Sequence, residues 1–174
     1  PSNKNLMREI SDKAKEAYYS AKNDEAQVAG SARSPQDAMQ EALRAINEYL
    51  RKESKKGDVT WLGNLHFALF AVASDDIYLS KVGGIKVVLA RQNELMDITG
   101  ESEGKYSSSY AENIFSNVLS GKILLEDKII VLTKDVFDFF EKSGILLSLA
   151  QTTAKLPEKQ LKELGFEDKE ISVY

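Results

Sequence analysis

The sequence contains no cysteine, only three prolines and a single histidine among its 174 residues. Without cysteine the chain has no disulfide, no thiolate metal site and no cysteine nucleophile. The lone histidine, His66, cannot build a zinc site by itself when thiolates are missing. The lack of disulfides fits a reducing compartment, so we expect a cytoplasmic protein.

Long apolar runs are also missing, since the longest extends only from Phe67 to Ala73. A transmembrane helix needs about 20 apolar residues, so we expect no membrane contact. Lysine and arginine occur mostly in ones and twos and the net charge is -4, which predicts no nucleic-acid surface. The densest basic group, residues 51–56, falls at an expected helix end, where cations offset the helix dipole.

The first part of the chain has the apolar period of helices. Apolar residues recur at steps of three and four from about residue 4 to 24, which predicts an amphipathic helix. A second helix should begin at Ser34-Pro35, with serine as the N-cap, proline at the first helical position and Asp37 as an acid at the third. This helix should stop near Lys56-Gly57. The sequence therefore predicts a helical region over residues 1–57.

From about residue 62 the apolar period changes to two, which is typical of strands. Residues 65–72 are apolar on both faces, and this predicts a central strand that is covered on both sides. Strands and short turns then alternate over residues 61–99, which indicates an antiparallel meander. The further expected strands are 77–81, 85–91 and 95–98, with turns at Asp75-Asp76, Gly83-Gly84 and Gln92-Asn93.

The polar stretch 99–109 should be an exposed loop. A strand and helical part is expected over residues 110–174. Because strands do not alternate with helices, we expect an α+β fold in a single domain over residues 1–174. The expected elements of the last part are a short helix or irregular segment at 110–119, strands at 123–125 and 128–133, helices between Val136 and Leu149, and a final helix at 157–164.

Two segments resemble the signatures of a known family. The first contains Val82-Gly83-Gly84-Ile85-Lys86 and the second contains Thr133-Lys134-Asp135. They are similar to the Val-Gly-Asp-Ser-Arg and Ser/Thr-Asp-Gly segments of the type 2C, metal-dependent serine/threonine protein phosphatases. The order of expected elements over residues 1–150 resembles that family as well. The resemblance implies an antiparallel β-sandwich flanked by helices, here with outer strands missing.

The differences from the family fall on residues that carry its chemistry. The resemblance implies two Mg²⁺ or Mn²⁺ ions held by carboxylates, which activate the attacking water. Here Gly84, Ile85 and Lys86 stand in place of Asp-Ser-Arg, and Lys134 stands in place of a metal-binding aspartate. An ammonium group cannot be an oxygen ligand. We therefore expect a degenerate metal centre, no catalytic residues and no cofactor.

Asp135 is the one carboxylate that could still serve as a metal ligand. A shift of one residue would bring it to the family position, but side chains alternate across a strand, so the shift needs a bulge. Asp135 has a second interpretation as the cap that starts a helix. Asp138 fits a charge in the first helical turn.

The remaining candidates have structural explanations that we favour. His66 should be packed or hydrogen-bonded in the core, and Trp61 and Tyr18-Tyr19 should pack in the core or between layers. Asp75-Asp76 should form a turn and not a cation site. Ser107-Ser108-Ser109 could be phosphorylated, but an exposed loop explains it as well.

Three functions remain open. The first is a phosphatase-like domain without catalysis that acts as a binding or regulatory module. The second is a fragment of an active Mg²⁺- or Mn²⁺-dependent phosphatase whose missing strands lie upstream, and the third is an unrelated α+β interaction domain. Missing outer strands would leave open sheet edges, so we expect a protein partner or a homodimer.

Overall fold

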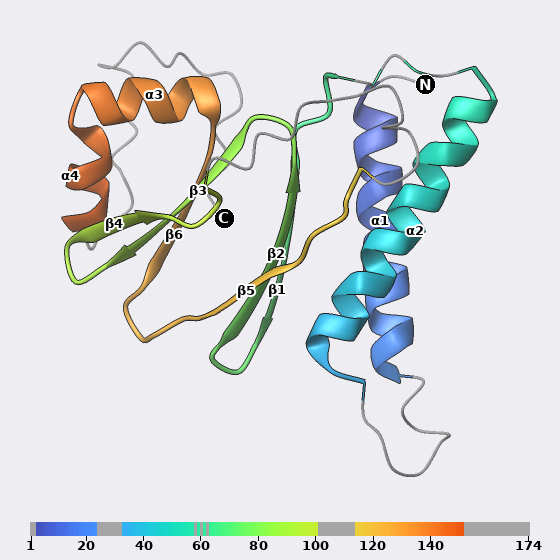
Figure 1. Cartoon of the computed structure of the whole chain (residues 1–174), viewed down its shortest axis with the longest axis horizontal. Coiled ribbons are helices and arrows are strands. Elements are labelled where there is room, and N and C mark those ends of the chain that lie inside the picture. The colour runs from blue at the N-terminus through green and yellow to red at the C-terminus, as the bar shows by residue number, and fades with distance from the viewer. Residues whose placement is uncertain are drawn as a thin grey trace. The chain divides into compact units, whose positions relative to one another are not determined.

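The computed structural model describes residues 3–23, 33–57, 59, 61, 63–100 and 114–151. Four helices and six strands lie in these residues (Figure 1). The strands form two three-stranded sheets, with the orders β1-β2-β5 and β4-β3-β6. The expected α+β class is therefore confirmed, while the sandwich of sheets stays a prediction. None of the helices in the described residues is long and apolar enough to cross a membrane.

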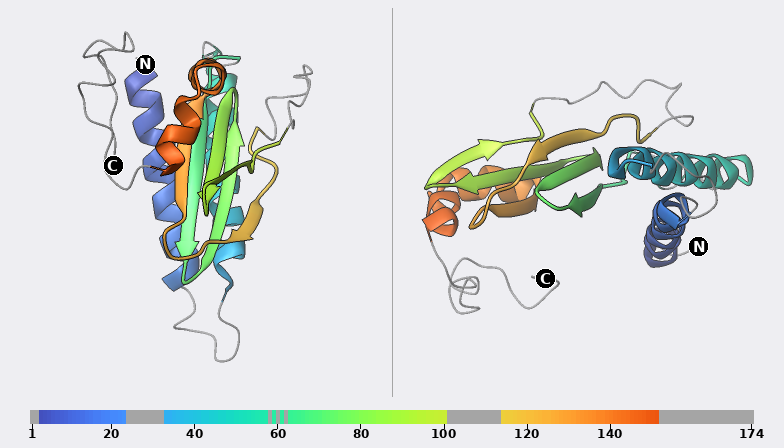
Figure 2. Two further views of the ribbon diagram at one scale, coloured as in Figure 1. Left: turned by 90° about the vertical axis from the view of Figure 1, so that its left-hand side faces the viewer. Right: turned by 90° about the horizontal axis from the view of Figure 1, so that it is seen from below.

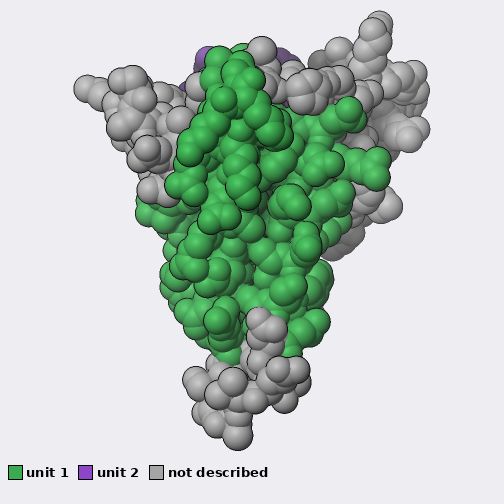
Figure 3. Space-filling view, turned by 90° about the vertical axis from the view of Figure 1, so that its right-hand side faces the viewer, with its two compact units in different colours: residues 1–85, 101–125 green, residues 86–100, 126–174 purple. Residues whose placement is uncertain are grey.

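The chain divides into two compact units (Figure 3). Unit 1 contains residues 1–85 and 101–125, and unit 2 contains residues 86–100 and 126–174. The chain therefore passes from one unit to the other three times, and both units are discontinuous in sequence.

Unit 1 begins with the two predicted helices, α1 (Asn3–Asn23) and α2 (Pro35–Lys55). The start of α2 is the predicted one, because the Asp37 N–H donates to Ser34 Oγ at 3.1 Å and the Ser34 N–H donates to Asp37 Oδ2 at 3.2 Å. Such a capping box satisfies two backbone donors that the first helical turn leaves open. Lys52 and Lys55 occupy the last turn, as expected from the helix dipole.

The apolar stripes of α1 and α2 meet in the core of unit 1. Fully buried side chains come from both helices, and Trp61 joins them with 3% of its surface exposed. Burying a side chain of this size contributes about 1.5–3 kcal/mol, so this cluster supplies much of the stability of the unit. The largest buried side chains in the helices are Ile10, Met39, Ile46 and Leu50.

The sheet of unit 1 contains β1 (Phe67–Ala73), β2 (Asp76–Val82) and β5 (Leu119–Lys122). A turn at Ser74-Asp75 joins β1 to β2, and Ala73 pairs with Asp76 in the antiparallel register. β1 lies at one end of the sheet, on the side of β2 away from β5 (Figure 2). The prediction of a central strand here is therefore wrong for the described residues.

The third strand of unit 1 lies earlier in the sequence than expected. β5 ends at Lys122, and residues 123–125 are not a strand. Leu119 pairs with Leu79, and Leu125 is 95% exposed. The apolar run 123–125 suggested a strand, but pairing with β2 decides where the strand lies. The described residues 114–118 are irregular, and residues 101–113 and 157–164 lie outside the described part of the chain.

Unit 2 is built around β3 (Ile85–Arg91), which begins at the last residue of unit 1 and lies between β4 (Glu94–Asp97) and β6 (Lys128–Thr133). Residues 87–90 of β3 are all buried, as expected for a strand covered on both faces. The turn between β3 and β4 falls on the predicted Gln92-Asn93, both with positive φ. The helices of unit 2 are α3 (Lys134–Lys142) and α4 (Ile145–Gln151).

Two cationic side chains tie the ends of these elements together. Arg91 donates from Nε to Asp127 Oδ1 at 2.9 Å and from a second nitrogen to Oδ2 at 2.6 Å. This fork raises the pKa of Arg91 through the hydrogen bond to Asp127, whose side chain is only 4% exposed. Lys128 Nζ donates to the Ala150 carbonyl at 2.6 Å, and it thereby satisfies an open acceptor at the end of α4.

Candidate functional site

Gly83 and Gly84 form the tight turn between β2 and β3. Gly83 has a φ of +71°, and an added Cβ would overlap the Leu65 carbonyl oxygen. The Gly84 N–H donates to His66 Nδ1 at 2.8 Å, so this ring nitrogen must be unprotonated to accept the bond. The predicted hydrogen-bonding role of His66 is confirmed, although its side chain is exposed and not packed in the core.

The other side of this turn is held by Lys81. Its ammonium group donates to the Ile85 carbonyl oxygen at 2.9 Å. The turn therefore uses backbone groups of Gly84 and Ile85 for its own hydrogen bonds. Neither residue has a side-chain oxygen, so neither offers a side-chain ligand for a hard cation.

In unit 2, Lys86 forms a partly buried ion pair with Asp97, at 2.9 Å between Nζ and Oδ2. The second carboxylate oxygen of Asp97 accepts the Thr99 N–H at 2.9 Å and also the Thr99 hydroxyl. Burial acts to raise the pKa of Asp97, but the hydrogen bonds from Thr99 and Lys86 outweigh burial and hold the pKa below its ordinary value. The ammonium of Lys86 also lies 5.7 Å from the centre of the Phe137 ring.

Lys134 and Asp138 face each other across one turn of α3. Lys134 Nζ lies 2.8 Å from Asp138 Oδ2, and this hydrogen bond lowers the pKa of Asp138. Thr133 is the N-cap of α3, so the capping role expected for Asp135 is wrong. Asp135 instead lies in the first turn, where a carboxylate offsets the positive end of the helix dipole. Asp138 lies one turn further along than expected.

The four residues that the resemblance aligns with the family's chemistry offer no side-chain oxygen to a divalent cation. Gly84 has no side chain, Ile85 is a hydrocarbon, and the ammonium groups of Lys86 and Lys134 are both ion-paired with carboxylates. Over the described ranges, no three His, Cys, Asp or Glu side chains are grouped so that they could hold a metal ion. Metal binding by Asp135 stays a prediction.

The structure also shows where the other residues singled out in the sequence lie. Trp61 lies in the core of unit 1 as predicted, and Tyr18 packs against that core. Tyr19 contacts the ring of Tyr18 but is 61% exposed, so it does not lie in the core. The turn falls on Ser74-Asp75, and Asp76 begins β2, where its carboxylate pairs with Lys122 at 2.7 Å. Residues 107–109 lie outside the described part.

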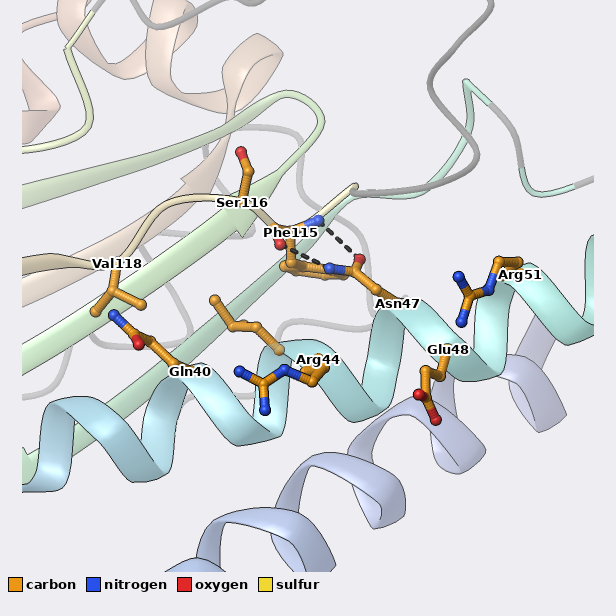
Figure 4. Close-up of a pocket in the computed structure, with 9 residues that line it drawn as sticks. Gln40, Arg44, Asn47, Glu48, Arg51, Phe115, Ser116 and Val118 are labelled. Carbon is orange, nitrogen blue, oxygen red and sulfur yellow. Dashed lines mark hydrogen bonds between the residues drawn. The ribbon is translucent and has the colours of Figure 1, made fainter. Parts of the chain in front are cut away.

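A groove runs beside α2 in unit 1, with a volume of about 540 Å³ (Figure 4). One wall is the irregular segment 114–118, which Asn47 holds in place. Asn47 Nδ2 donates to the Phe115 carbonyl at 2.8 Å, and the Phe115 N–H donates to Asn47 Oδ1 at 3.0 Å. Both residues are buried, and the ring of Phe115 meets Phe67 edge to face. The groove is lined by Gln40, Leu43, Arg44, Asn47, Glu48, Arg51, Phe115, Ser116 and Val118.

Sequence reasoning missed this groove. One signal was available, because Asn47 is a polar residue next to the apolar stripe that contains Leu43, Ile46 and Leu50. A buried polar group needs hydrogen-bond partners, so such a residue indicates a segment that packs against the helix. The identity of that segment was not visible, since Phe115 lies 68 residues away.

The charges of the groove are mixed. Arg44 and Arg51 stand two turns apart on α2, and Glu48 lies between them in sequence (Figure 4). Arg44 donates to both carboxylate oxygens of Glu41, at 2.7 and 2.8 Å. Arg51 is exposed and makes no hydrogen bond or ion pair with the described residues. The lining therefore contains two guanidinium groups and one carboxylate, and the guanidinium group of Arg44 is already paired with Glu41 outside the lining.

Comparison with known protein families and with curated proteins finds no match for this chain. The resemblance to the type 2C phosphatases therefore continues to rest on the quoted segments and on the order of elements.

Proposed function

We propose that this chain is a type 2C phosphatase-like domain that works as a binding or regulatory module and does not itself hydrolyse phosphate esters. The ion pair between Lys134 and Asp138 carries the proposal, because the resemblance aligns Lys134 with a metal-binding aspartate of the family and the ammonium group of Lys134 is paired with a carboxylate. A charged ammonium group has donors only, so it repels a cation and cannot ligate one. Gly84 and Ile85 bring no side-chain oxygen to the other family position.

The groove beside α2 supports the binding role. Most of its lining residues are polar or charged, and Arg44 and Arg51 are among them. A guanidinium group matches carboxylates and phosphates, which it binds through two parallel hydrogen bonds. The groove therefore favours an acidic segment of a partner protein.

The test is an assay of phosphate release from a phosphopeptide and from p-nitrophenyl phosphate, with Mg²⁺ or Mn²⁺ added. We expect no turnover above that of the metal in buffer alone. Turnover that Asp135→Ala abolishes and that Asp138→Ala leaves intact would overturn the proposal. Asp138→Ala is a matched control, since it removes an acid from the same helix. That result would favour the alternative, a fragment of an active metal-dependent phosphatase.

A further inference from the structure

β1 combines the composition of a central strand with a position at the edge of a sheet. All seven residues of Phe67–Ala73 are uncharged, and proline does not occur among them. Edge strands usually carry charges or proline, because their open backbone groups otherwise pair with other chains. The other three edge strands of the described sheets each include a charged residue: Glu94 and Asp97 in β4, Lys122 in β5 and Lys128 in β6.

The register shows which backbone groups of β1 point away from β2. The turn Ser74-Asp75 has two residues, so its flanking residues Ala73 and Asp76 exchange hydrogen bonds. The Ile123 N–H donates to the Asp75 carbonyl at 2.8 Å, which agrees with this register. Hydrogen-bonded pairs alternate along antiparallel strands, so the backbone groups of odd-numbered β2 residues point toward β5 and those of even-numbered residues point toward β1. Every second residue of β1 therefore bonds to β2. The outward N–H and C=O groups belong to Ala68, Phe70 and Val72.

The side chains of β1 complement a second, antiparallel copy of the same strand. When two copies are centred on Phe70, each larger side chain except Phe70 lies opposite an alanine, and the two Phe70 rings meet at the centre. Side chains directly opposite each other across antiparallel strands are in contact, so this alternation of size avoids both clashes and gaps. The two copies of β1 also do not repel each other electrostatically, since the strand has no charged side chain. The opposed pairs are Phe67 with Ala73, Ala68 with Val72, and Leu69 with Ala71.

We propose that β1 is a self-association edge, which pairs antiparallel with β1 of a second copy of this chain about a twofold axis at Phe70. The β1-β2-β5 sheets of the two copies then join into a single sheet of six strands, in the order β5-β2-β1-β1-β2-β5. The outward groups of Ala68, Phe70 and Val72 make six hydrogen bonds between the copies. The dimer is isologous, because the same strand serves both sides.

The first experiment removes an outward N–H without touching the hairpin. Val72 is 57% exposed, and its N–H points away from β2, so Val72→Pro leaves the β1 to β2 bonds in place. Two of the six intermolecular bonds disappear, and the proline ring crowds the opposite strand. We expect the dissociation constant, measured by sedimentation equilibrium, to rise at least about tenfold. Val72→Thr keeps the N–H and the branched shape, so it should dimerise like the unchanged chain.

Far-UV circular dichroism and the fluorescence of the buried Trp61 establish that Val72→Pro is folded. A chain that stays monomeric at the highest concentrations that sedimentation can read would overturn the proposal. A dimer that Val72→Pro leaves unchanged would overturn it too, because the contact would then lie elsewhere.

The second experiment tests the register through a single new thiol, since the chain has no cysteine of its own. In the proposed dimer the two Phe70 Cα atoms form a hydrogen-bonded pair about 5.5 Å apart, within the span of a disulfide. Phe70→Cys should therefore form a disulfide-linked dimer under mild oxidation. Val72→Cys is the matched control, because its two copies would be roughly 13 Å apart along the strand. Equal cross-linking of both variants, or cross-linking of Val72→Cys alone, would contradict the register.

Discussion

Gly83 adopts a backbone conformation at which a side chain meets two separate obstacles. Its φ of +71° is unfavourable for residues with a Cβ, and the site of that Cβ is already filled by the Leu65 carbonyl oxygen and by His66. Gly57 has a φ of +90° with nothing within 4 Å of an added Cβ. Alanine substitutions at Gly83 and Gly57 therefore separate the free-energy cost of backbone strain from the cost of a steric clash.

We predict that Gly83→Ala lowers the free energy of unfolding by at least about 2 kcal/mol more than Gly57→Ala does. Strain at positive φ affects both variants, whereas only the first must displace the peptide that precedes His66. Denaturant unfolding followed by Trp61 fluorescence measures the difference within unit 1. Equal losses of unfolding free energy in the two variants would show that Leu65 and His66, just before β1, move aside at little cost.

Between elements, the contact of Asn47 with Phe115 joins α2 to a segment without regular structure. The amide group of Asn47 satisfies the N–H and the C=O of Phe115 at the same time. Both residues are buried, so water cannot easily replace the lost bonds.

Asn47→Ala should therefore lower the free energy of unfolding by roughly 2–4 kcal/mol, because it leaves two buried backbone groups unpaired. Gln40→Ala is the control, since Gln40 lines the same groove but is exposed, and its loss should change stability by less than about 0.5 kcal/mol. Hydrogen exchange at the Phe115 amide gives a second readout, which should become faster only in Asn47→Ala. An unchanged exchange rate would mean that other contacts hold the segment.

The elements that the sequence predicted well are those with local signals. The capping box at Ser34 and the turn at Gln92-Asn93 involve neighbouring residues, and both were found where the sequence placed them. The ion pair of Lys134 with Asp138 is also local, at the i,i+4 spacing of a helix, but it was not predicted.

The predictions that failed depend on pairing across long stretches of sequence. The apolar character of β1 indicated a strand with two neighbours, but composition does not reveal where the neighbours are. The position of β5 is decided by its register with β2, some 40 residues earlier in the chain. The hydrogen bond of His66 was predicted, but its partner, the backbone N–H of Gly84, could not be identified from the pattern of side chains.

For the molecule as a whole, Asp97 links stability to pH. Its pKa in the folded chain lies below the ordinary value, so the folded state favours the charged form. The resulting stabilisation is present above the unfolded pKa of about 3.9, and it is lost as the pH falls through the lower pKa of the folded state. The ion pair with Lys86 and the bonds from Thr99 break at the same protonation step.

We predict that Asp97→Asn is less stable than the unchanged chain near neutral pH and that the difference narrows as the pH falls below about 4. Urea unfolding followed by far-UV circular dichroism over a series of pH values measures this, because Trp61 reports on unit 1 and Asp97 lies in unit 2. A constant difference over the acidic range would show that protonation of Asp97 does not weaken the folded state.

The distance in sequence between Asn47 and Phe115 has a consequence for synthesis on the ribosome. Helix α2 is translated long before residue 115 of the 174, so α1 and α2 emerge before the segment that forms one wall of the groove. During that interval the flank of α2 that will meet Phe115 is exposed to solvent, which favours transient binding by chaperones. Slowing translation just before residue 115 would lengthen this exposed stage.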